Sequence, residues 1–226
     1  MDRLPQTVST PDGVSVSLDL YREKDHAAAV VICPGFFQSK DTATFQRLSQ
    51  ALTGEYDVLA MDFRGHGRST GLYTFSAREG VDLEAVLEWA GGRYAGLGVL
   101  GFSMGAAIAI NTLARLSGRV RSLIAVSGPS SFEEIELKWW TPGALRTGVD
   151  GLEPGAGCRP GSLWLKKERP IDHIARLSPM PVLFVHGTRD AIVGVEHSRR
   201  LYAAASEPKR LEIIEGGSHA EALFRD

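Results

Sequence analysis

The sequence predicts an α/β fold in which a mainly parallel sheet is covered by helices on both faces. Short apolar runs alternate with amphipathic segments along most of the chain, which is the pattern of repeated strand–helix units. Several of these runs show no polar alternation, as expected of strands that are buried on both sides. Gly-rich polar turns follow the runs. In such sheets the functional site lies at the carboxyl ends of the strands, so these turns are the places to search.

Size and composition indicate a globular protein. The chain has 226 residues, of which 43% are hydrophobic and 23% charged, and we expect one domain over residues 1–226. The net charge of −2 lacks the excess of basic residues that is typical of nucleic-acid-binding proteins. No apolar run approaches the roughly 18 residues of a membrane span, and residues 1–17 lack the apolar core of a signal peptide. We therefore expect a cytoplasmic protein with a small-molecule substrate, and its oligomeric state is not predicted.

The predicted elements follow one another in a regular order. Residues 14–20 alternate apolar with polar side chains, which predicts a half-exposed antiparallel strand. Residues 28–33 are continuously apolar, which predicts a strand covered on both faces. The other predicted strands are residues 56–62, 97–100, 120–127, 182–186 and 210–214. The predicted helices are residues 42–52 with Asp41 as their cap, 78–94, 104–116 and a helix within 191–205.

One long segment, residues 129–172, interrupts this order because it contains no strand–helix unit. Within it, residues 141–161 carry six glycines and three prolines. A connection of this length in a compact domain is usually functional or disordered. Its position between two strands predicts a small cap over the functional site.

Ser103 is the candidate nucleophile. It lies in Gly101-Phe102-Ser103-Met104-Gly105, a G-x-S-x-G motif between an apolar strand and a helix of small residues. This turn forces the serine into a strained backbone conformation and needs tiny residues where helix and strand approach each other, at Gly101 and Gly105. Free N–H groups at the helix N-terminus then point toward the reacting atom. A simple Gly-Ser turn is the alternative interpretation of so short a motif.

His219 and Asp190 are the candidate base and acid. A serine hydroxyl is a weak nucleophile until a base takes its proton, and the base needs a group that orients it. His219 follows the predicted strand 210–214 and Asp190 follows the predicted strand 182–186, so both belong at the carboxyl edge of the sheet. The order Ser103, Asp190, His219 along the chain is the order typical of this architecture.

Two other histidines lie near strand ends. His66 sits in a Gly-rich loop after residues 56–62 and is the main competitor for the role of base. Its surroundings favour a hydrogen-bonding role instead. His186 closes the strand before Asp190, and we expect it to form hydrogen bonds within the turn that presents this aspartate.

Acyl transfer also needs donors for the developing oxyanion. One is expected to be the backbone N–H of Met104, which follows the nucleophile, and the other should come from the turn after residues 28–33. Phe36 is the favoured second donor because it follows the glycine that turns the chain back toward the site. Phe37 remains an alternative.

These motifs resemble those of the α/β-hydrolase superfamily over nearly the whole chain from about residue 14. The matching segments are CPGFFQSK, MDFRGHGRST, GFSMG, HGTRD and GGSH. The resemblance implies a mostly parallel sheet of the eight-stranded type, a cap at about residues 129–172, a Ser103–His219–Asp190 triad, and oxyanion donors at Phe36 and Met104. Within the superfamily the chain most resembles the serine-aminopeptidase-like and cinnamoyl (feruloyl) esterase-like group.

Two positions depart from the family pattern. Pro34 stands where the family usually has a histidine before the oxyanion glycine, so the hydrogen bonding of that turn is left open. The sequence ends seven residues after His219, where members continue with a full C-terminal helix. This departure implies either a shortened chain or another way of closing that face, such as a partner subunit.

The expected activity is that of a carboxylesterase acting through an acyl-enzyme, without a cofactor. The two cysteines, Cys33 and Cys158, lie far apart and suggest neither a disulfide framework nor a metal site. Thioesterase, lysophospholipase or carbon–carbon bond hydrolase activity is open with the same triad, and a non-catalytic ligand-binding protein is the rival from another class. Candidates for a substrate pocket, which could instead pack the cap onto the domain, are Phe37, Trp139, Trp140 and Trp164.

Overall fold

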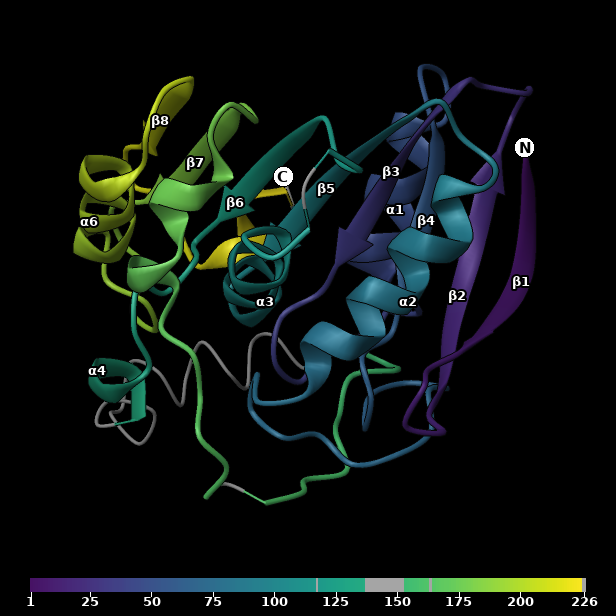
Figure 1. The fold of residues 1–226 in the computed structure, drawn as a ribbon, viewed down its shortest axis with the longest axis horizontal. Coiled ribbons are helices and arrows are strands. Elements are labelled where there is room, and N and C mark those ends of the chain that lie inside the picture. The colour runs from purple at the N-terminus through teal and green to yellow at the C-terminus, as the bar shows by residue number, and fades with distance from the viewer. Residues whose placement is uncertain (117, 137–152, 163, 225–226) are drawn as a thin grey trace.

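The computed structural model describes residues 1–116, 118–136, 153–162 and 164–224. In these residues an eight-stranded sheet lies between two layers of helices, with the strand order β1-β2-β4-β3-β5-β6-β7-β8 (Figure 1). The strands are β1 (Asp2–Ser9), β2 (Ser15–Arg22), β3 (Ala28–Cys33), β4 (Asp57–Met61), β5 (Gly96–Phe102), β6 (Ser122–Val126), β7 (Val182–Gly187) and β8 (Lys209–Ile214).

The strand pairing confirms the predicted, mainly parallel sheet. The neighbouring strands β4, β3, β5, β6, β7 and β8 pair in parallel, in this order across the sheet. Their carboxyl ends therefore lie at the same edge. β2 runs antiparallel to β4, as the alternating pattern of residues 14–20 predicts. The predicted half-exposure is wrong, because none of its residues is exposed. β1 was not predicted. It is a mostly exposed edge strand whose residues show no apolar periodicity, and it is defined by its antiparallel pairing with β2 from Asp2–Arg22 to Ser9–Ser15.

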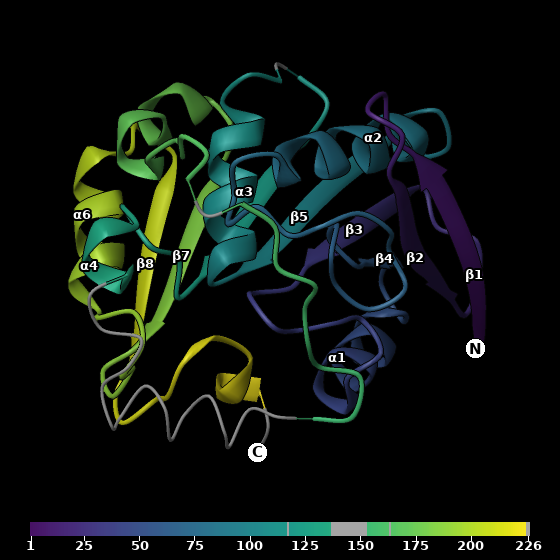
Figure 2. The ribbon, with the colours of Figure 1, turned by 90° about the horizontal axis from the view of Figure 1, so that it is seen from below.

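Helices cover both faces of the sheet, as predicted. Figures 1 and 2 show α2 (Glu79–Gly91), α3 (Met104–Leu113) and α6 (Glu196–Ala204) on one face, and α1 (Ala43–Leu52) on the other with the short 3-10 helix η3 (Ala220–Phe224). Shorter helical segments are α4 (Glu133–Glu136), η1 (Pro170–Asp172) and η2 (Ile174–Leu177).

The predicted helix cap at Asp41 is wrong. Thr42 is the N-cap residue of α1 and its own side chain makes no capping hydrogen bond, while the Glu153 carboxylate accepts from the N–H of Thr44 in the first turn. The Asp41 carboxylate instead pairs with Arg3, Lys40 and Arg68. These three cations occupy the oxygens that would otherwise accept from the first N–H groups of the helix.

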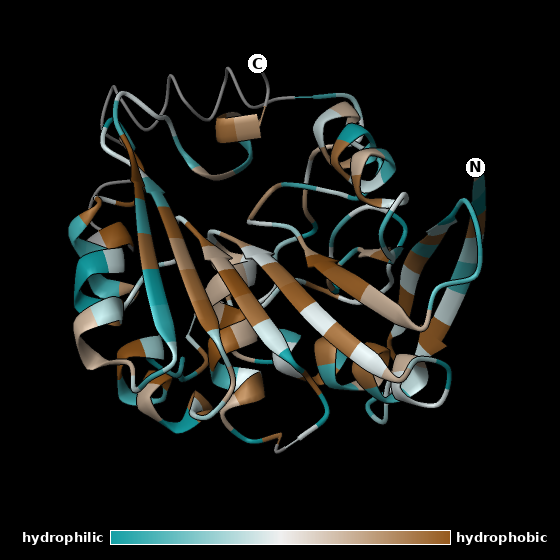
Figure 3. Ribbon diagram, turned by 90° about the horizontal axis from the view of Figure 1, so that it is seen from above, coloured by the Kyte–Doolittle hydropathy of each residue, from teal (hydrophilic) through white to brown (hydrophobic). Residues whose placement is uncertain are grey.

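In the described part of the chain, most buried hydrophobic side chains form two clusters, one on each side of the sheet. The larger lies under α2, α3 and α6, and the smaller lies between the sheet and α1 with η3. Figure 3 shows hydrophobic residues along the central strands. In the smaller cluster Phe102 meets Phe45 edge to face, with ring centroids 5.1 Å apart. Full burial of one such side chain contributes about 1.5–3 kcal/mol, and that of Phe102 fixes the chain immediately before Ser103.

Part of the predicted cap contacts the loops at the carboxyl edge of the sheet. The N–H of Gly157 donates to the Phe37 carbonyl at 2.7 Å, and the Glu153 carboxylate accepts from the N–H of Thr44 at 3.0 Å. A cap over residues 129–172 on a single domain stays a prediction, because much of the segment, with Trp139 and Trp140, lies outside the described residues.

Candidate functional site

Ser103 occupies the turn between β5 and α3 in a strained backbone conformation. Its φ is 50° and its ψ is −117°, a region that residues with a Cβ rarely adopt. The surrounding hydrogen bonds hold it there: the Ser103 N–H donates to the Val126 carbonyl at 2.8 Å, and the Ser103 carbonyl accepts from the N–H of Ala106 at 3.0 Å. The predicted sharp turn is present, and it lifts the serine side chain out of the line of the strand.

Three glycines allow the segments around Ser103 to approach one another. A Cβ on Gly101 would lie 2.7 Å from the Cα of Ala106, and a Cβ on Gly105 would lie 2.2 Å from the Cys33 carbonyl oxygen. A Cβ on Gly35 would lie 3.2 Å from the Cβ of Ser103. The turn after β3 therefore packs directly against the serine turn.

Replacing Gly105 with alanine is expected to lower the free energy of unfolding by about 1–3 kcal/mol, the usual cost of overpacking. The added methyl would collide with backbone, which cannot rotate away. Gly91→Ala in α2 is the matched control, because a Cβ there meets nothing within 4 Å, and alanine in a helix is favoured over glycine by up to about 1 kcal/mol. Urea denaturation measures both. Equal stability of the two variants would contradict the close approach at Gly105.

Asp190 and His219 lie against each other at the ends of β7 and β8. His219 Nδ1 donates to Asp190 Oδ2 at 2.7 Å. The other oxygen, Asp190 Oδ1, accepts from the N–H groups of Ile192 at 3.0 Å and Val193 at 2.8 Å. With its proton on Nδ1, the neutral imidazole keeps Nε2 as an acceptor, which is the state a general base requires.

His186 forms hydrogen bonds within the turn that presents Asp190, as predicted. Its Nε2 donates to the Val193 carbonyl at 2.8 Å and lies 3.2 Å from Asp190 Oδ2. Its Nδ1 accepts from the Ser198 hydroxyl at 2.6 Å. His186 is fully buried, so it fixes both the turn and the Asp190 carboxylate.

The charges of the pair stabilise each other. Burial of the Asp190 carboxyl opposes its ionisation, but the charge of His219 and the hydrogen bonds from His186 and His219 outweigh burial and lower the pKa of Asp190. Burial alone would depress the pKa of His219. The charge of Asp190, its hydrogen bond and the charge of Glu221 more than offset this and raise the pKa of His219 above its usual value.

The segment that carries His219 is tied to the strand next to Ser103. The Ala220 N–H donates to the Ser127 hydroxyl at 3.0 Å, and Ser127 directly follows Val126, the backbone partner of Ser103. Both Ser127 and Ala220 have positive φ, 49° and 46°. Ser127 was not predicted as part of the site, because a serine at a strand end carries no signal that distinguishes it from other loop serines.

The acid turn and the base loop also pack backbone against backbone. A Cβ on Gly187 would lie 2.2 Å from the Gly217 carbonyl oxygen, and the Arg189 N–H donates to that same carbonyl at 2.9 Å. Glycine at both positions thus lets the two loops close on each other, and this contact holds Asp190 and His219 at hydrogen-bonding distance.

The two expected oxyanion donors differ from Phe37 in their hydrogen bonding. The Phe37 N–H donates to His66 Nε2 at 3.2 Å. Within the described residues no acceptor is found for the N–H groups of Phe36 and Met104. The Gly35–Phe36 peptide lies against Ser103, and Met104 opens α3. Of the alternatives in the turn after β3, Phe37 already donates to His66, and the choice of Phe36 as an oxyanion donor stays a prediction.

His66 serves as a hydrogen-bonding element. Its Nδ1 pairs with the Arg64 carbonyl at 3.2 Å while Nε2 accepts from Phe37. Burial lowers the pKa of His66 to about 4, so the ring is neutral at pH 7 and its acceptor stays available. This geometry accounts for His66 without a proton-transfer role.

Aromatic side chains gather beside the turn after β3. Phe36 stacks on Tyr73 with centroids 5.3 Å apart and contacts Phe37 and Phe75 at 5.2 and 5.5 Å. Phe36 and Phe37 are 40% and 39% exposed. Trp164 is 94% exposed, so the described residues do not enclose its side chain in a pocket. The assignment of Phe37, Trp139, Trp140 and Trp164 to a substrate pocket stays a prediction.

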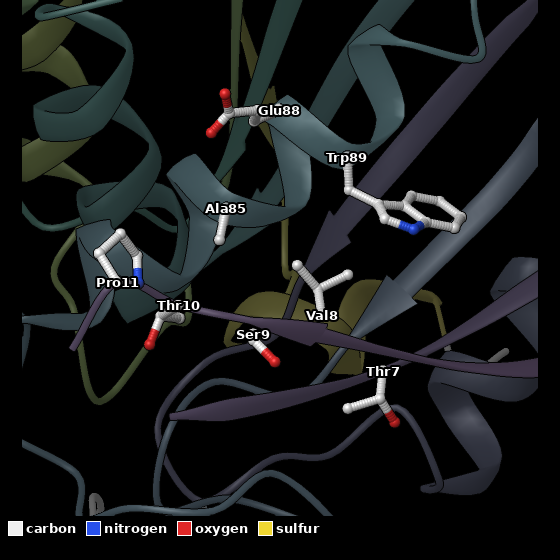
Figure 4. A pocket seen from close by; sticks show the side chains of 8 residues that line it. All are labelled: Thr7, Val8, Ser9, Thr10, Pro11, Ala85, Glu88 and Trp89. Atoms are coloured by element: carbon white, nitrogen blue, oxygen red, sulfur yellow. The ribbon is translucent and has the colours of Figure 1, made fainter. Parts of the chain in front are cut away.

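A shallow groove lies elsewhere, between β1 and α2 (Figure 4). It has a volume of about 480 Å³ and includes none of the three candidate catalytic residues. Its lining residues are Thr7, Val8, Ser9, Thr10, Pro11, Ala85, Glu88 and Trp89. Among residues with described positions, His, Cys, Asp and Glu side chains form no cluster of three or more suited to a metal ion. In the same part of the chain, no helix is both long and apolar enough to cross a membrane.

Comparison with known proteins gives matches in sequence and in structure. Residues 28–145 match the sequence profile of a family described as alpha/beta hydrolase fold. The uncharacterized protein YfhR of Escherichia coli K12 is 42% identical over 66 residues, 28% of this chain and 23% of the relative. The uncharacterized protein Rv2307c of Mycobacterium tuberculosis H37Rv is 32% identical over 214 residues, 88% of this chain and 65% of that protein. The matches thus cover about a quarter of the first relative and less than two thirds of the second.

A solved structure supports the same fold. The Pyrococcus furiosus esterase Pf2001 is similar with a TM-score of 0.78 and 23% sequence identity, over 99% of this chain and 86% of that chain. At this level of identity the similarity shows the arrangement of strands and helices, and the chemistry has to be argued from the residues themselves.

Proposed function

The chain belongs to the alpha/beta hydrolase fold family, and on this premise we propose that it is a serine hydrolase that cleaves carboxylic esters. One observation carries the proposal. At the carboxyl edge of the sheet, the strained turn of Ser103 bonds to Val126, and the next residue, Ser127, bonds to Ala220 in the loop of His219. In that loop His219 Nδ1 donates to Asp190 at 2.7 Å. The similar structure from Pyrococcus furiosus is that of an esterase, which favours esters among acyl substrates.

In the proposed reaction His219 Nε2 takes the proton of the Ser103 hydroxyl as Oγ attacks the acyl carbon. The imidazolium that forms is stabilised by the Asp190 carboxylate. The N–H groups of Phe36 and Met104 donate hydrogen bonds to the acyl oxygen and stabilise its negative charge, as does the positive end of the α3 dipole. His219 returns the proton to the leaving alcohol. Water then attacks the acyl-enzyme by the same route and releases the acid.

A fluorophosphonate probe tests the nucleophile. The purified protein is expected to bind one probe covalently, and mass spectrometry of the peptides should locate the added mass on Ser103, because only an activated serine reacts at an appreciable rate. Ser103→Ala should bind none. A folded wild-type protein that remains unlabelled, or a label on another serine, would contradict the proposal.

A substrate panel separates esters from other acyl donors. It contains p-nitrophenyl esters of increasing chain length, aryl esters and acyl-CoA thioesters. Highest kcat/KM for the oxygen esters is the expected result. A preference for thioesters would keep the nucleophile but replace the proposed substrate class, and a preference for aryl esters would support the feruloyl-esterase-like group.

A further inference from the structure

Gln38 and Glu221 connect two parts of the site that are 183 residues apart in sequence. Gln38 Nε2 donates to Glu221 Oε1 at 2.8 Å, and each residue is only 8% exposed. Gln38 ends the turn that contains Phe36, and Glu221 lies two residues after His219. No sequence pattern links them, so neither was predicted as a site residue.

We infer that the Gln38–Glu221 hydrogen bond is a latch that positions His219 relative to the turn carrying the Phe36 N–H. The inference rests on the proposed function, since it assigns these two side chains to the same reaction. Neither needs to touch the substrate. Both are positioning residues that act through their neighbours in the chain.

On the turn side, Gln38 completes a tightly held loop. Its N–H donates to the Gly35 carbonyl at 3.3 Å, and the Phe37 carbonyl accepts from Gly157 at 2.7 Å. The preceding peptide N–H is held by His66. If the Gln38 side chain moved, the Gly35–Phe36 peptide, which lies against Ser103, would therefore move with it.

On the base side, Glu221 belongs to η3, which begins directly after His219. Ala220 is bound by Ser127, and the Ala222 N–H donates to the His219 carbonyl at 2.9 Å. Because Glu221 lies between these two residues, its hydrogen bond to Gln38 fixes η3 toward the turn after β3, and His219 with it.

Glu221, one partner of the latch, also places a negative charge near His219, the proposed base. Two carboxylates act on His219: Asp190 from the loop after β7 and Glu221 from η3, and both raise the pKa of His219. His186 on β7 faces Asp190, and His66, after β4, faces the turn of Gln38. Only the imidazole form of His219 can accept the serine proton, so activity should rise as pH increases through this elevated pKa.

Glu221→Gln tests the charge while retaining a carbonyl that can accept from Gln38. The pKa of His219, followed by NMR of its ring in a Ser103→Ala background, should fall relative to Ser103→Ala alone. The acidic limb of kcat/KM for p-nitrophenyl acetate should move to lower pH in the same direction. Glu55→Gln removes an exposed carboxylate from the connection between α1 and β4. It is the control for loss of charge alone and should change neither the pKa of His219 nor the acidic limb.

Gln38→Met tests the hydrogen bond while leaving the charge in place. It should lower kcat on the high-pH plateau about tenfold, since small displacements of catalytic groups cost at least this much, with KM nearly unchanged. Gln46→Met is the matched control, because Gln46 Nε2 donates to the Asp41 carbonyl at 2.7 Å and the variant removes the same kind of hydrogen bond from the start of α1. Thermal denaturation establishes that all four variants are folded.

The NMR titration decides the charge part even if the protein hydrolyses no ester, so a failure of the latch differs from a failure of the proposed function. An unchanged His219 titration in Glu221→Gln would overturn the inference. So would a loss of kcat in Gln38→Met no larger than the loss in Gln46→Met.

Discussion

Replacing His219 with alanine is expected to lower kcat/KM for p-nitrophenyl esters by about 10⁴-fold or more. Without a base, the Ser103 hydroxyl must lose its proton to water, and the leaving alcohol must gain one from water. The oxyanion donors and the substrate contacts remain, so the residual rate stays above that of the uncatalysed reaction. Stopped-flow or steady-state hydrolysis of p-nitrophenyl acetate measures the loss.

A second histidine variant controls for general damage. His173→Ala removes an imidazole in the connection between η1 and η2, where the ring lies 3.9 Å from Glu168. It should retain wild-type kcat/KM, because η1 and η2 pack against α3 and α6. His219 instead bonds to Asp190, and its neighbour Ala220 bonds to Ser127. If His219→Ala retained more than about a tenth of the activity, another group would have to be the base, and His66 would be the first to test.

Local patterns were sufficient to predict every strand of the sheet except β1, and they led to the three candidate catalytic residues. β3 begins and ends at the predicted residues, because a continuous apolar run bounded by turns has few other ways to fold. Ser103, Asp190 and His219 each follow a predicted strand, so the parallel pairing of β5 to β8 brings their turns to one edge. Their proposed roles as nucleophile, acid and base were predicted from motifs of a few residues each.

Features that depend on long-range contacts could not be predicted in this way. β1 has no apolar face of its own and exists through its pairing with β2. Gln38 and Glu221 are ordinary polar residues until the fold buries them together. The assignment of Asp41 as a cap failed for the same reason, because its distant partners, Arg3 and Arg68, come from β1 and from the loop after β4.

The hydrogen bonds around Asp190 lead to a second strong expectation, for Asp190→Asn. Two backbone N–H groups, those of Ile192 and Val193, donate to Oδ1. An amide nitrogen cannot accept them, so the carbonyl oxygen of the new asparagine must take this place. The NH₂ group then occupies the position of Oδ2 and points at His219 Nδ1, 2.7 Å away.

This orientation reverses the tautomer of His219. Since the NH₂ group donates, Nδ1 must become the acceptor, and the ring proton moves to Nε2, the nitrogen that has to receive the proton of Ser103. We expect kcat to fall by about 10³–10⁴-fold with little change in KM, as a base in the wrong tautomer predicts. His186 adds to the effect, because its Nε2 proton, 3.2 Å from Oδ2, would face another donor.

Nitrogen-15 NMR of the His219 ring distinguishes the tautomers directly, with the proton on Nδ1 in the wild type and on Nε2 in Asp190→Asn. Asp172→Asn, a carboxylate whose side chain is 57% exposed, is the control and should leave both kcat and the tautomer as in the wild type. A wild-type tautomer in Asp190→Asn combined with a full loss of kcat would mean that Asp190 acts mainly through its charge. Retained kcat would remove Asp190 from the proposed triad.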